Sequence, residues 1–357
     1  MTYTCACGDS YTTEIEDGTI DRTFNRTVSL GSDYKVLFRI AKSKVAGSDY
    51  WMEVTAYNYV DGELVATTHV IEAATNGNNH EFVSPGIAAK NMNDRITWVF
   101  YEIKDGYRYH HTPDEFNLVT YYNSAETQYN NAVATGNTNY INVFGKVITL
   151  LKEMFNYGAN AQVYFEYNLE AEEGNAYAGL VNLHIPEADR KLGKEAYADI
   201  EFGETRVEGN EAGMIYTSKG NSADLEQQII FTNVYEFKKA NEIPMSELVY
   251  RGSYKDATGA IIEVVIPGTE FAYANTAETQ IKVPFSTIAA KDLRANITGA
   301  IYDSEGNQVS ETVTSSFACY ASVYLGMNTT NATVVKLKPI LLATLAYSDA
   351  ALKYFQK

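Results

Sequence analysis

Histidine, the usual general base of enzymes, is scarce in this 357-residue sequence. The five copies are His69, His80, His110, His111 and His184. Nucleophilic catalysis requires a base beside the nucleophile, and His110 and His111 are neighbours in an expected strand, where they would point to opposite faces. The sequence contains no G-x-S-x-G elbow, no H-E-x-x-H zinc motif and no phosphate-binding glycine loop. Its acidic residues are too numerous to single out a hydrolytic pair. We therefore predict that the chain is not an enzyme.

A pair of thiols near the N-terminus resembles half of a metal site. Cys5 and Cys7 stand one residue apart before a glycine, but tetrahedral zinc needs two further ligands that the neighbouring sequence lacks. Asp- and Asn-rich loops can hold calcium through oxygen, yet no D-x-D-x-D-G loop occurs. We expect no cofactor, with zinc at Cys5 and Cys7 and calcium in the loops as the alternatives. Cys319 falls in a helical pattern and is expected to be a buried thiol.

The abundant aromatic residues suggest that the chain binds a ligand by ring stacking and does not catalyse a reaction. Tyr occurs 28 times and Trp only twice. Flat rings stack on sugar rings, and amide or carboxylate groups bind sugar hydroxyls. The candidate ligand-binding residues are Trp51, Trp98, Tyr107 and Tyr109, of which the two tyrosines share one strand face. Both tryptophans also fit the buried face of a strand, so their exposure decides between ligand binding and core packing.

The charge balance excludes several partners. Lys and Arg total 28 against 45 Asp and Glu, which gives a formal net charge of −17. Such a surface repels nucleic acid and anionic lipid, and no apolar run approaches the roughly 20 residues of a membrane-spanning helix. We expect no nucleic acid and no membrane insertion. The residues after Met1 do not form a signal peptide, and we interpret the chain as a fragment of a longer protein.

Periodicity predicts strands followed by helices, twice over. Alternating apolar and aromatic residues predict antiparallel strands at 34–40, 50–57, 64–70 and 96–103, with hairpin turns at Asp61-Gly62 and Asp105-Gly106. A spacing of three and four then predicts helices over 116–131 and about 144–165. Strand patterns return at 196–202, 228–231 and 261–266, and helical patterns at 317–325 and 337–355.

These patterns define a domain plan. We expect a mainly β (α+β) chain of two homologous, tandem β-sandwich-like units, each followed by a C-terminal helical hairpin. Residues 1–20 would be the end of a preceding Cys-containing repeat, and 21–168 the first sandwich with its helical hairpin. The acidic segment 169–195 would be a linker, and 196–357 the second sandwich and hairpin.

Matching residues support the repeat. Ile87-Ala88-Ala89-Lys90 recurs as Ile288-Ala289-Ala290-Lys291. Ile96-Thr97 and Tyr101 recur at the same offset, as Ile297-Thr298 and Tyr302. In the last helices, Leu151, Phe155, Ala161, Tyr164 and Phe165 correspond to Leu341, Leu345, Ala351, Tyr354 and Phe355.

The helical segment 150–165, LLKEMFNYGANAQVYF, resembles the "MLNYGAAAQ-YF" helix of large surface or secreted proteins from anaerobic gut Firmicutes (Clostridia). Residues 288–293 with 346–355 are similar to the second unit of the same tandem pair, and residues 2–14 resemble the closing end of a Cys- and Gly-containing repeat. The resemblance implies an extracellular or cell-surface location and transfers no catalytic residues.

The sequence therefore favours a non-catalytic, extracellular structural or adhesion module pair of a bacterial surface or secreted protein. Its partners would be glycans or host or bacterial surface proteins. The alternative is a carbohydrate-binding accessory module that uses exposed aromatic residues, and it requires Trp51 or Trp98 to lie on an accessible face.

Overall fold

A computed structural model describes residues 2–4, 10–12, 17–30, 34–167, 203–209, 214–226 and 228–356. Strands account for 39% and helices for 33%, so the chain is a sheet-rich α+β protein, as the sequence predicts. Within the described ranges, none of the helices combines the length and apolarity that crossing a bilayer requires.

Internal contacts divide the chain into two compact units. Unit 1 contains most of the chain up to Ser124, and unit 2 contains the chain from Ala125 together with the short segments Leu30–Asp33 and Ala88–Lys90. The predicted linker, 169–195, and the predicted strand at 196–202 lie outside the described residues. The predicted boundaries therefore stay predictions.

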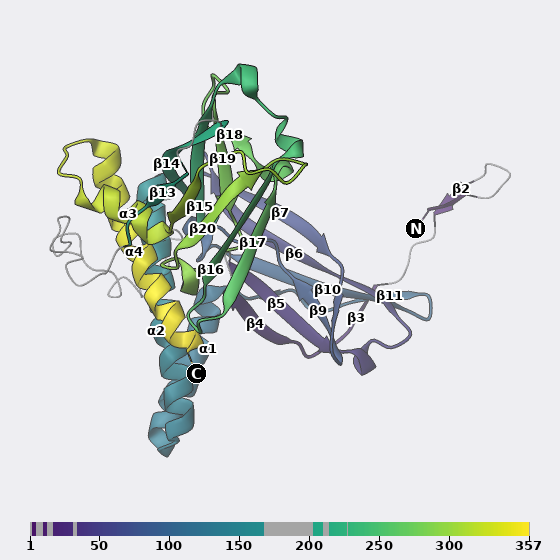
Figure 1. The fold of residues 1–357 in the computed structure, drawn as a ribbon. Helices are drawn as coiled ribbons and strands as arrows, with labels where there is room; N and C mark the ends of the chain where they lie inside the picture. The colour runs from purple at the N-terminus through teal and green to yellow at the C-terminus, as the bar shows by residue number, and fades with distance from the viewer. Residues whose placement is uncertain are drawn as a thin grey trace. The chain divides into compact units, whose positions relative to one another are not determined.

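Unit 1 contains two sheets (Figure 1). One has the order β3-β11-β10-β6-β7, with β12 on β10, and the other has the order β4-β5-β9-β8. The bounds of these strands are β3 (Asp17–Thr19), β4 (Asn25–Leu30), β5 (Tyr34–Ala41), β6 (Asp49–Val60), β7 (Glu63–Ile71), β8 (Ala74–Asn76), β9 (Asn79–Val83), β10 (Ile96–Lys104), β11 (Tyr107–His110) and β12 (Asp114–Glu115). A separate antiparallel pair is formed by β1 (Thr2–Thr4) and β2 (Ser10–Thr12).

Both predicted hairpin turns are confirmed. Asp61-Gly62 joins β6 to β7 and Asp105-Gly106 joins β10 to β11. All four residues have a positive φ, between 51° and 83°. This is the type I′ turn, whose backbone twist matches that of the flanking strands. The short turns fix the register of the hairpins, and that register decides which side chains share a face.

Aromatic side chains from both sheets form the core of unit 1. Trp98 of β10 lies 5.1 Å from Phe38 of β5, and Phe100 of β10 lies 5.9 Å from Phe82 of β9, measured between ring centroids. All four side chains are buried. Along β10 buried and half-buried residues alternate, because successive side chains of a strand point to opposite faces. The two sheets therefore pack face to face as a sandwich.

A buried ion pair joins the N-terminal segment of unit 1 to this core. Glu102 of β10 is fully buried. Its carboxylate accepts hydrogen bonds from Nε (3.0 Å) and Nη2 (2.8 and 3.1 Å) of Arg22, and from the Ser48 hydroxyl (2.6 Å). A buried carboxylate needs such partners because desolvation of an unpaired charge costs several kcal/mol. Arg22 therefore fixes the chain ahead of β4 against β10.

Unit 2 contains two further sheets (Figure 1). Their orders are β13-β21-β20-β16-β17 and β14-β15-β19-β18. The bounds are β13 (Arg206–Glu208), β14 (Tyr216–Asp224), β15 (Ile230–Phe237), β16 (Val249–Lys255), β17 (Ile261–Pro267), β18 (Ala272–Tyr273), β19 (Gln280–Phe285), β20 (Ile297–Tyr302) and β21 (Thr312–Ser315).

The core of unit 2 is also formed between its sheets. The Tyr250 ring of β16 meets the Phe285 ring of β19 edge to face at 5.2 Å. Beside it, Gly252 and Gly299 are directly paired on β16 and β20. A Cβ atom at Gly299 would lie 2.4 Å from the Arg251 carbonyl oxygen and 2.5 Å from the Tyr250 hydroxyl. Glycine is required here because the backbones and the tyrosine fill the space.

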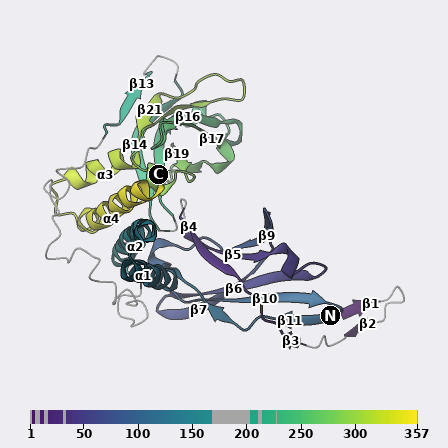
Figure 2. The ribbon, with the colours of Figure 1, turned by 90° about the horizontal axis from the view of Figure 1, so that it is seen from below.

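Four α-helices occur in the described part of the chain (Figure 2). They are α1 (Leu118–Thr135), α2 (Thr138–Phe165), α3 (Phe317–Gly326) and α4 (Ala332–Phe355). Side-chain caps set three starts: Asn137 accepts from the Tyr140 amide, Ser316 from the Cys319 amide and Asn331 from the Thr333 and Val334 amides. Each cap satisfies backbone donors that have no partner within the helix.

Within unit 2, α2 and α4 lie side by side (Figures 1 and 2). Tyr157 of α2 and Tyr347 of α4 stack with their ring planes 6° apart. At one end of the pair, the Lys146 ammonium donates to the Gln356 carbonyl oxygen at 3.0 Å. At the other end, the Lys336 ammonium pairs with the Glu166 carboxylate. The helices therefore run antiparallel.

Candidate functional site

A row of half-exposed aromatic side chains crosses the outward face of the first sheet of unit 1. Register sets Tyr101 of β10 directly opposite Trp51 of β6 on one side and His110 of β11 on the other. The Trp51 and Tyr101 rings stack at 5.1 Å with planes 11° apart, and the His110 ring lies 6.4 Å from Tyr101. The Trp51 indole N–H points to the Glu53 carboxylate at 3.4 Å.

Because Trp51 and Tyr101 stack on each other, this row offers a ligand only the ring surfaces that the stacking leaves uncovered. The sheet face continues with Thr55 and Thr68, whose hydroxyls are 2.8 Å apart on β6 and β7. Ring faces attract the C–H surface of a sugar, and the carboxylate and hydroxyl groups beside them accept and donate hydrogen bonds. These groups are of the kinds that contact sugars, and none of them pairs a nucleophile with a base.

Trp98 lies in the core and not on this face. Only 2% of its surface is exposed, with Phe38 at 5.1 Å and the His111 ring stacked at 4.9 Å. The sequence-based prediction that Trp98 is an exposed ligand-binding residue is therefore wrong, and Trp98 is a core residue. The reason is parity: Trp98 and Tyr101 are three apart on β10, so they point to opposite faces.

Tyr107 and Tyr109 share a face, but not the face of Trp51. They pair with Lys104 and Glu102 of β10, and Glu102 faces the core. Tyr107 is 50% exposed at the hairpin end. The ring of Tyr109 covers Gly18, where an added Cβ would lie 2.7 Å from it. The structure therefore brings Tyr101 and His110 to Trp51, in place of the two predicted tyrosines.

The structure says little about the two metal-site alternatives, which are zinc at Cys5 and Cys7 and calcium in the loops. Cys5 and Cys7 lie outside the described residues. Cys319 is a buried free thiol, as predicted. Across the described ranges, no group of three or more His, Cys, Asp or Glu side chains is placed to hold a metal ion.

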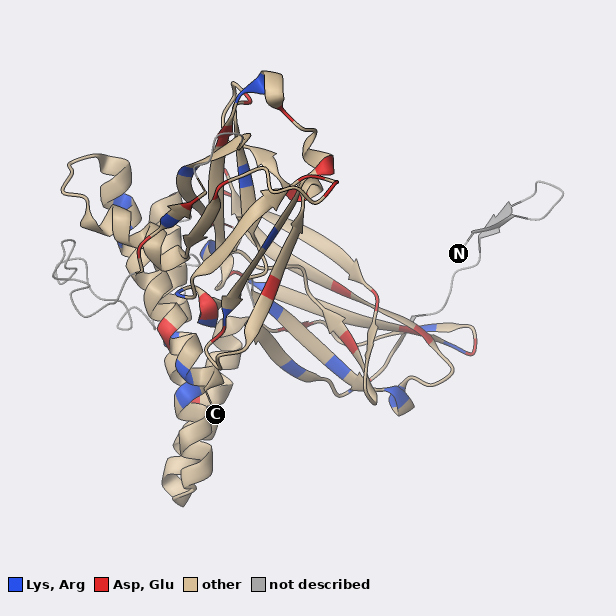
Figure 3. Ribbon diagram, in the orientation of Figure 1, with Lys and Arg blue, Asp and Glu red and all other residues tan. Residues whose placement is uncertain are grey.

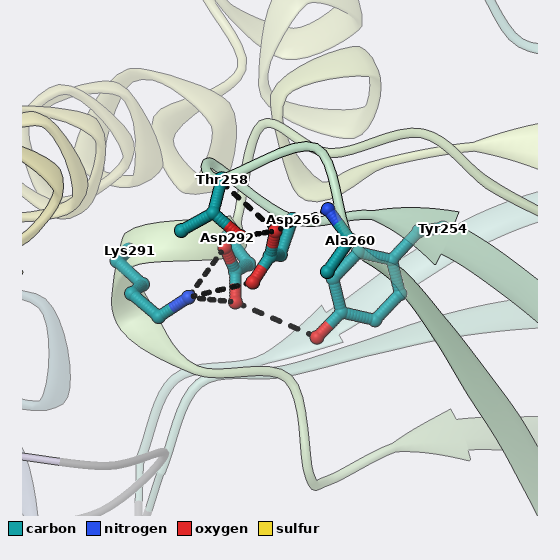
Figure 4. A network of polar contacts seen from close by, with 6 residues as sticks. All are labelled: Tyr254, Asp256, Thr258, Ala260, Lys291 and Asp292. Atoms are coloured by element: carbon teal, nitrogen blue, oxygen red, sulfur yellow. Dashed lines mark hydrogen bonds and ion pairs between the residues drawn. The ribbon is translucent and has the colours of Figure 1, made fainter. Parts of the chain in front are cut away.

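A polar network in unit 2 is a second concentration of titratable groups (Figure 4). Lys291 donates to both Asp292 oxygens, at 3.1 and 3.0 Å, and lies 3.9 Å from the Asp256 carboxylate. Asp256 also accepts from the hydroxyl and amide of Thr258, at 2.7 and 2.8 Å, and the hydroxyl bond chiefly lowers the pKa of its carboxyl. Burial, with the nearby Asp292, raises the pKa of Tyr254 to about 12.

Each charge of this network already has an internal partner. The Tyr254 hydroxyl points to Asp292 at 3.5 Å, and Asp292 is buried. The network ties the turn after β16 to the short helix η9 (Ala290–Asp292) and so stabilises the loop that precedes β20. We interpret it as structural, because its polar atoms bind one another.

The chain matches no protein-family model and no curated protein. The resemblance to the surface proteins of gut Firmicutes stays a prediction.

Proposed function

We propose that the chain is a non-catalytic structural or adhesion module pair of a bacterial surface or secreted protein, built from two homologous β-sandwich units. The main observation in support of this proposal is that the two units share a strand order. The order β11-β10-β6-β7 with β4-β5-β9-β8 in unit 1 matches the order β21-β20-β16-β17 with β14-β15-β19-β18 in unit 2, except that the register makes β21 the counterpart of β12 at this edge. Unrelated sandwiches can share a connection order of this kind, so the homology rests on the strand order together with the residue-level matches.

Residue-level matches support this proposal. The short helices η2 (Ala89–Asn91) and η9 stand at an offset of 201 residues, the offset of Ile96 to Ile297. The first edge strands differ, because β3 pairs parallel with β11 whereas β13 pairs antiparallel with β21. The correspondence is therefore strongest in the central strands, where packing constrains the sequence most.

An adhesion assay tests the proposed function. Beads coated with the purified chain would be applied to mucus-coated surfaces and to bacterial and epithelial cells. Binding that survives periodate oxidation of glycans but is lost after protease treatment of the target would support a protein partner. Binding abolished by periodate would support the glycan alternative. Beads that bind no surface would contradict adhesion and leave a spacing role.

Carbohydrate binding is the second candidate, and the stacked pair Trp51–Tyr101 favours it. The pair is half-exposed on a sheet face and has a carboxylate beside it. A glycan array and an insoluble-polysaccharide pull-down would compare the wild type with Trp51→Ala, and with Tyr107→Ala as a matched control on the opposite face. Binding lost only in Trp51→Ala, with an unchanged circular dichroism spectrum, supports this site. Equal binding by both variants contradicts it.

A further inference from the structure

A groove of about 1030 Å³ runs along α2 beside the C-terminal end of α4, within unit 2. Three lysines line it: Lys146 and Lys152 of α2 and Lys353 of α4. Tyr129 of α1 and Tyr354 of α4 contribute rings. The complete lining is Tyr129, Ile141, Asn142, Gly145, Lys146, Ile148, Thr149, Lys152, Ala350, Lys353, Tyr354 and Gln356, and it includes no carboxylate.

The charge of this groove is opposite to that of the chain. The sequence has a net charge of −17, whereas the charged residues that line the groove are all lysines; Figure 3 shows blue segments, with red ones among them, on the helix pair close to the end of α4. Lys146 donates to the Gln356 carbonyl, a neutral group. Neither Lys152 nor Lys353 forms an ion pair with any carboxylate of the described residues. The lysine charges are therefore available to a ligand, over the roughly 8 Å at which charges act in physiological salt.

The opposite end of the same helix pair supplies an internal comparison, which rests on the homology proposed above. An offset of 190 residues relates α2 to α4, as in Leu151 to Leu341. Lys152 then corresponds to Leu342, and Lys353 to Val163. Lys146 corresponds to Lys336, but the Glu166 carboxylate neutralises that ammonium.

The smaller cavity at this opposite end differs in its charges too. It has a volume of about 380 Å³ and is lined by Tyr164 and Leu337, the counterparts of Tyr354 and Val147. Its charged lining residues, Asp224 and Lys282, have opposite signs. Lysines are therefore not required at these two positions for the helix pair to form, since the equivalent positions carry the uncharged Leu342 and the exposed Val163.

We propose that this groove binds an acidic polysaccharide, one that has carboxylate or sulfate groups on its sugar rings. The lysine ammonium groups pair with the anionic groups, and the tyrosine rings pack against the sugar rings. The volume lies at the upper end of the range for small-ligand pockets, so a segment of a sugar chain has room in the groove. The acidic remainder of the protein repels every polyanion, and it repels most strongly the closely spaced phosphates of nucleic acid.

Isothermal titration calorimetry with the full chain tests the proposal. The probes are polygalacturonic acid, chondroitin sulfate, neutral dextran and inorganic polyphosphate, each at 50 and 200 mM NaCl. The key variant is Lys152→Leu with Lys353→Val, which introduces the side chains of the opposite end. The matched control is Lys336→Gln, which removes a lysine outside the groove.

We expect the wild type and the control to bind at least one acidic polysaccharide and not dextran, with weaker binding at the higher salt. The double variant should bind at least tenfold more weakly while its thermal unfolding is unchanged. Absence of acidic polysaccharide binding, binding only to polyphosphate, or equal binding by the double variant would each overturn the proposal. If the chain binds a glycan and only Trp51→Ala abolishes that binding, the groove proposal fails while the proposed function stands.

Discussion

Tyr157 of α2 and Tyr347 of α4 stack on each other with ring centroids 6.0 Å apart and ring planes 6° apart. The offset of 190 residues that relates the two helices makes these tyrosines each other's counterparts. A two-fold axis that passes between two helices brings counterparts together in this way, as in an isologous interface. The same offset makes Lys336 the counterpart of Lys146, and Gln356 the counterpart of Glu166. The contacts Lys146–Gln356 and Lys336–Glu166, one at each end of the helix pair, are therefore also equivalent. Under the homology proposed above, the helix pair is internally pseudo-symmetric.

Replacing either tyrosine should destabilise unit 2. Both are buried, and truncation of a buried aromatic side chain to alanine costs about 3–5 kcal/mol. Tyr157→Ala and Tyr347→Ala should therefore each lower the free energy of unfolding by about 3–5 kcal/mol. Because the rings touch, the double variant should show a coupling of about 0.5–1.5 kcal/mol. Urea unfolding followed by circular dichroism measures all three variants.

Phenylalanine substitutions are the matched controls for this pair. The Tyr157 hydroxyl donates to the Leu225 carbonyl at 3.2 Å, so Tyr157→Phe should cost about 0.5–1.5 kcal/mol through that hydrogen bond. Additive effects of the two alanine variants would show that the rings are not in contact.

The Arg22–Glu102 pair should matter far more than an exposed ion pair. Arg22→Met leaves a fully buried carboxylate with one hydroxyl partner, and breaking a buried pair in this way costs about 3–5 kcal/mol. As the comparison, Arg95→Met removes the exposed pair Arg95–Glu115 and should cost less than about 1 kcal/mol. Equal unfolding midpoints for the two variants would contradict the structural role given to Arg22.

Gly299 should resist even a single added methyl group. An alanine side chain there meets the Arg251 carbonyl at 2.4 Å, so β16 and β20 must separate. Overpacking of this kind costs about 1–3 kcal/mol. Gly306→Ala is unsuited as a control because of its positive φ, so Ala300→Gly on the same strand serves instead. Thermal unfolding should fall clearly for Gly299→Ala, and an unchanged midpoint would exclude the close approach of the strands.

Alkaline pH should unfold the protein through its buried tyrosines. Burial raises the pKa of Tyr34, Tyr157 and Tyr250 well above the ordinary value. A raised folded-state pKa stabilises the native state below the unfolded pKa of about 10, and this stability is lost as the pH rises further. The unfolding temperature should therefore begin to fall near that pH.

Tyrosinate absorbance at 295 nm and circular dichroism, recorded together, check this expectation. The buried tyrosines should ionise only as the circular dichroism signal is lost. Full ionisation near pH 10 with an unchanged spectrum would show that these rings are accessible to water.

Much of the fold could be predicted from local patterns. The turns at Asp61-Gly62 and Asp105-Gly106 were identifiable because a type I′ turn requires positive φ at adjacent residues, which Asp-Gly accepts. The helices ending at Phe165 and Phe355 were recognisable from their apolar spacing. Both signals are local and need no knowledge of the tertiary structure.

The candidate site was less predictable, because it depends on which face of each strand is buried. Trp51 and Trp98 both lie in strands with alternating apolar residues, and this pattern alone does not show which of the two is exposed. Tyr101 became a site residue only through the register of β10 on β6, which is a long-range property. The lysine groove was missed for a similar reason: Lys146 and Lys353 are brought together only by the antiparallel helix pair.

Cysteine cross-linking between α2 and α4 tests the central claim, that equivalent helices pair antiparallel about an axis at Tyr157 and Tyr347. With the three native cysteines replaced by serine, a short bismaleimide should link Lys146→Cys to Gln356→Cys and, reciprocally, Lys336→Cys to Glu166→Cys. Lys146→Cys with Glu166→Cys, about 30 Å apart along one helix, should not react within one molecule. Reaction at both reciprocal pairs confirms the pseudo-symmetric pairing. Efficient linkage of Lys146→Cys to Lys336→Cys instead would show a parallel arrangement and contradict the account.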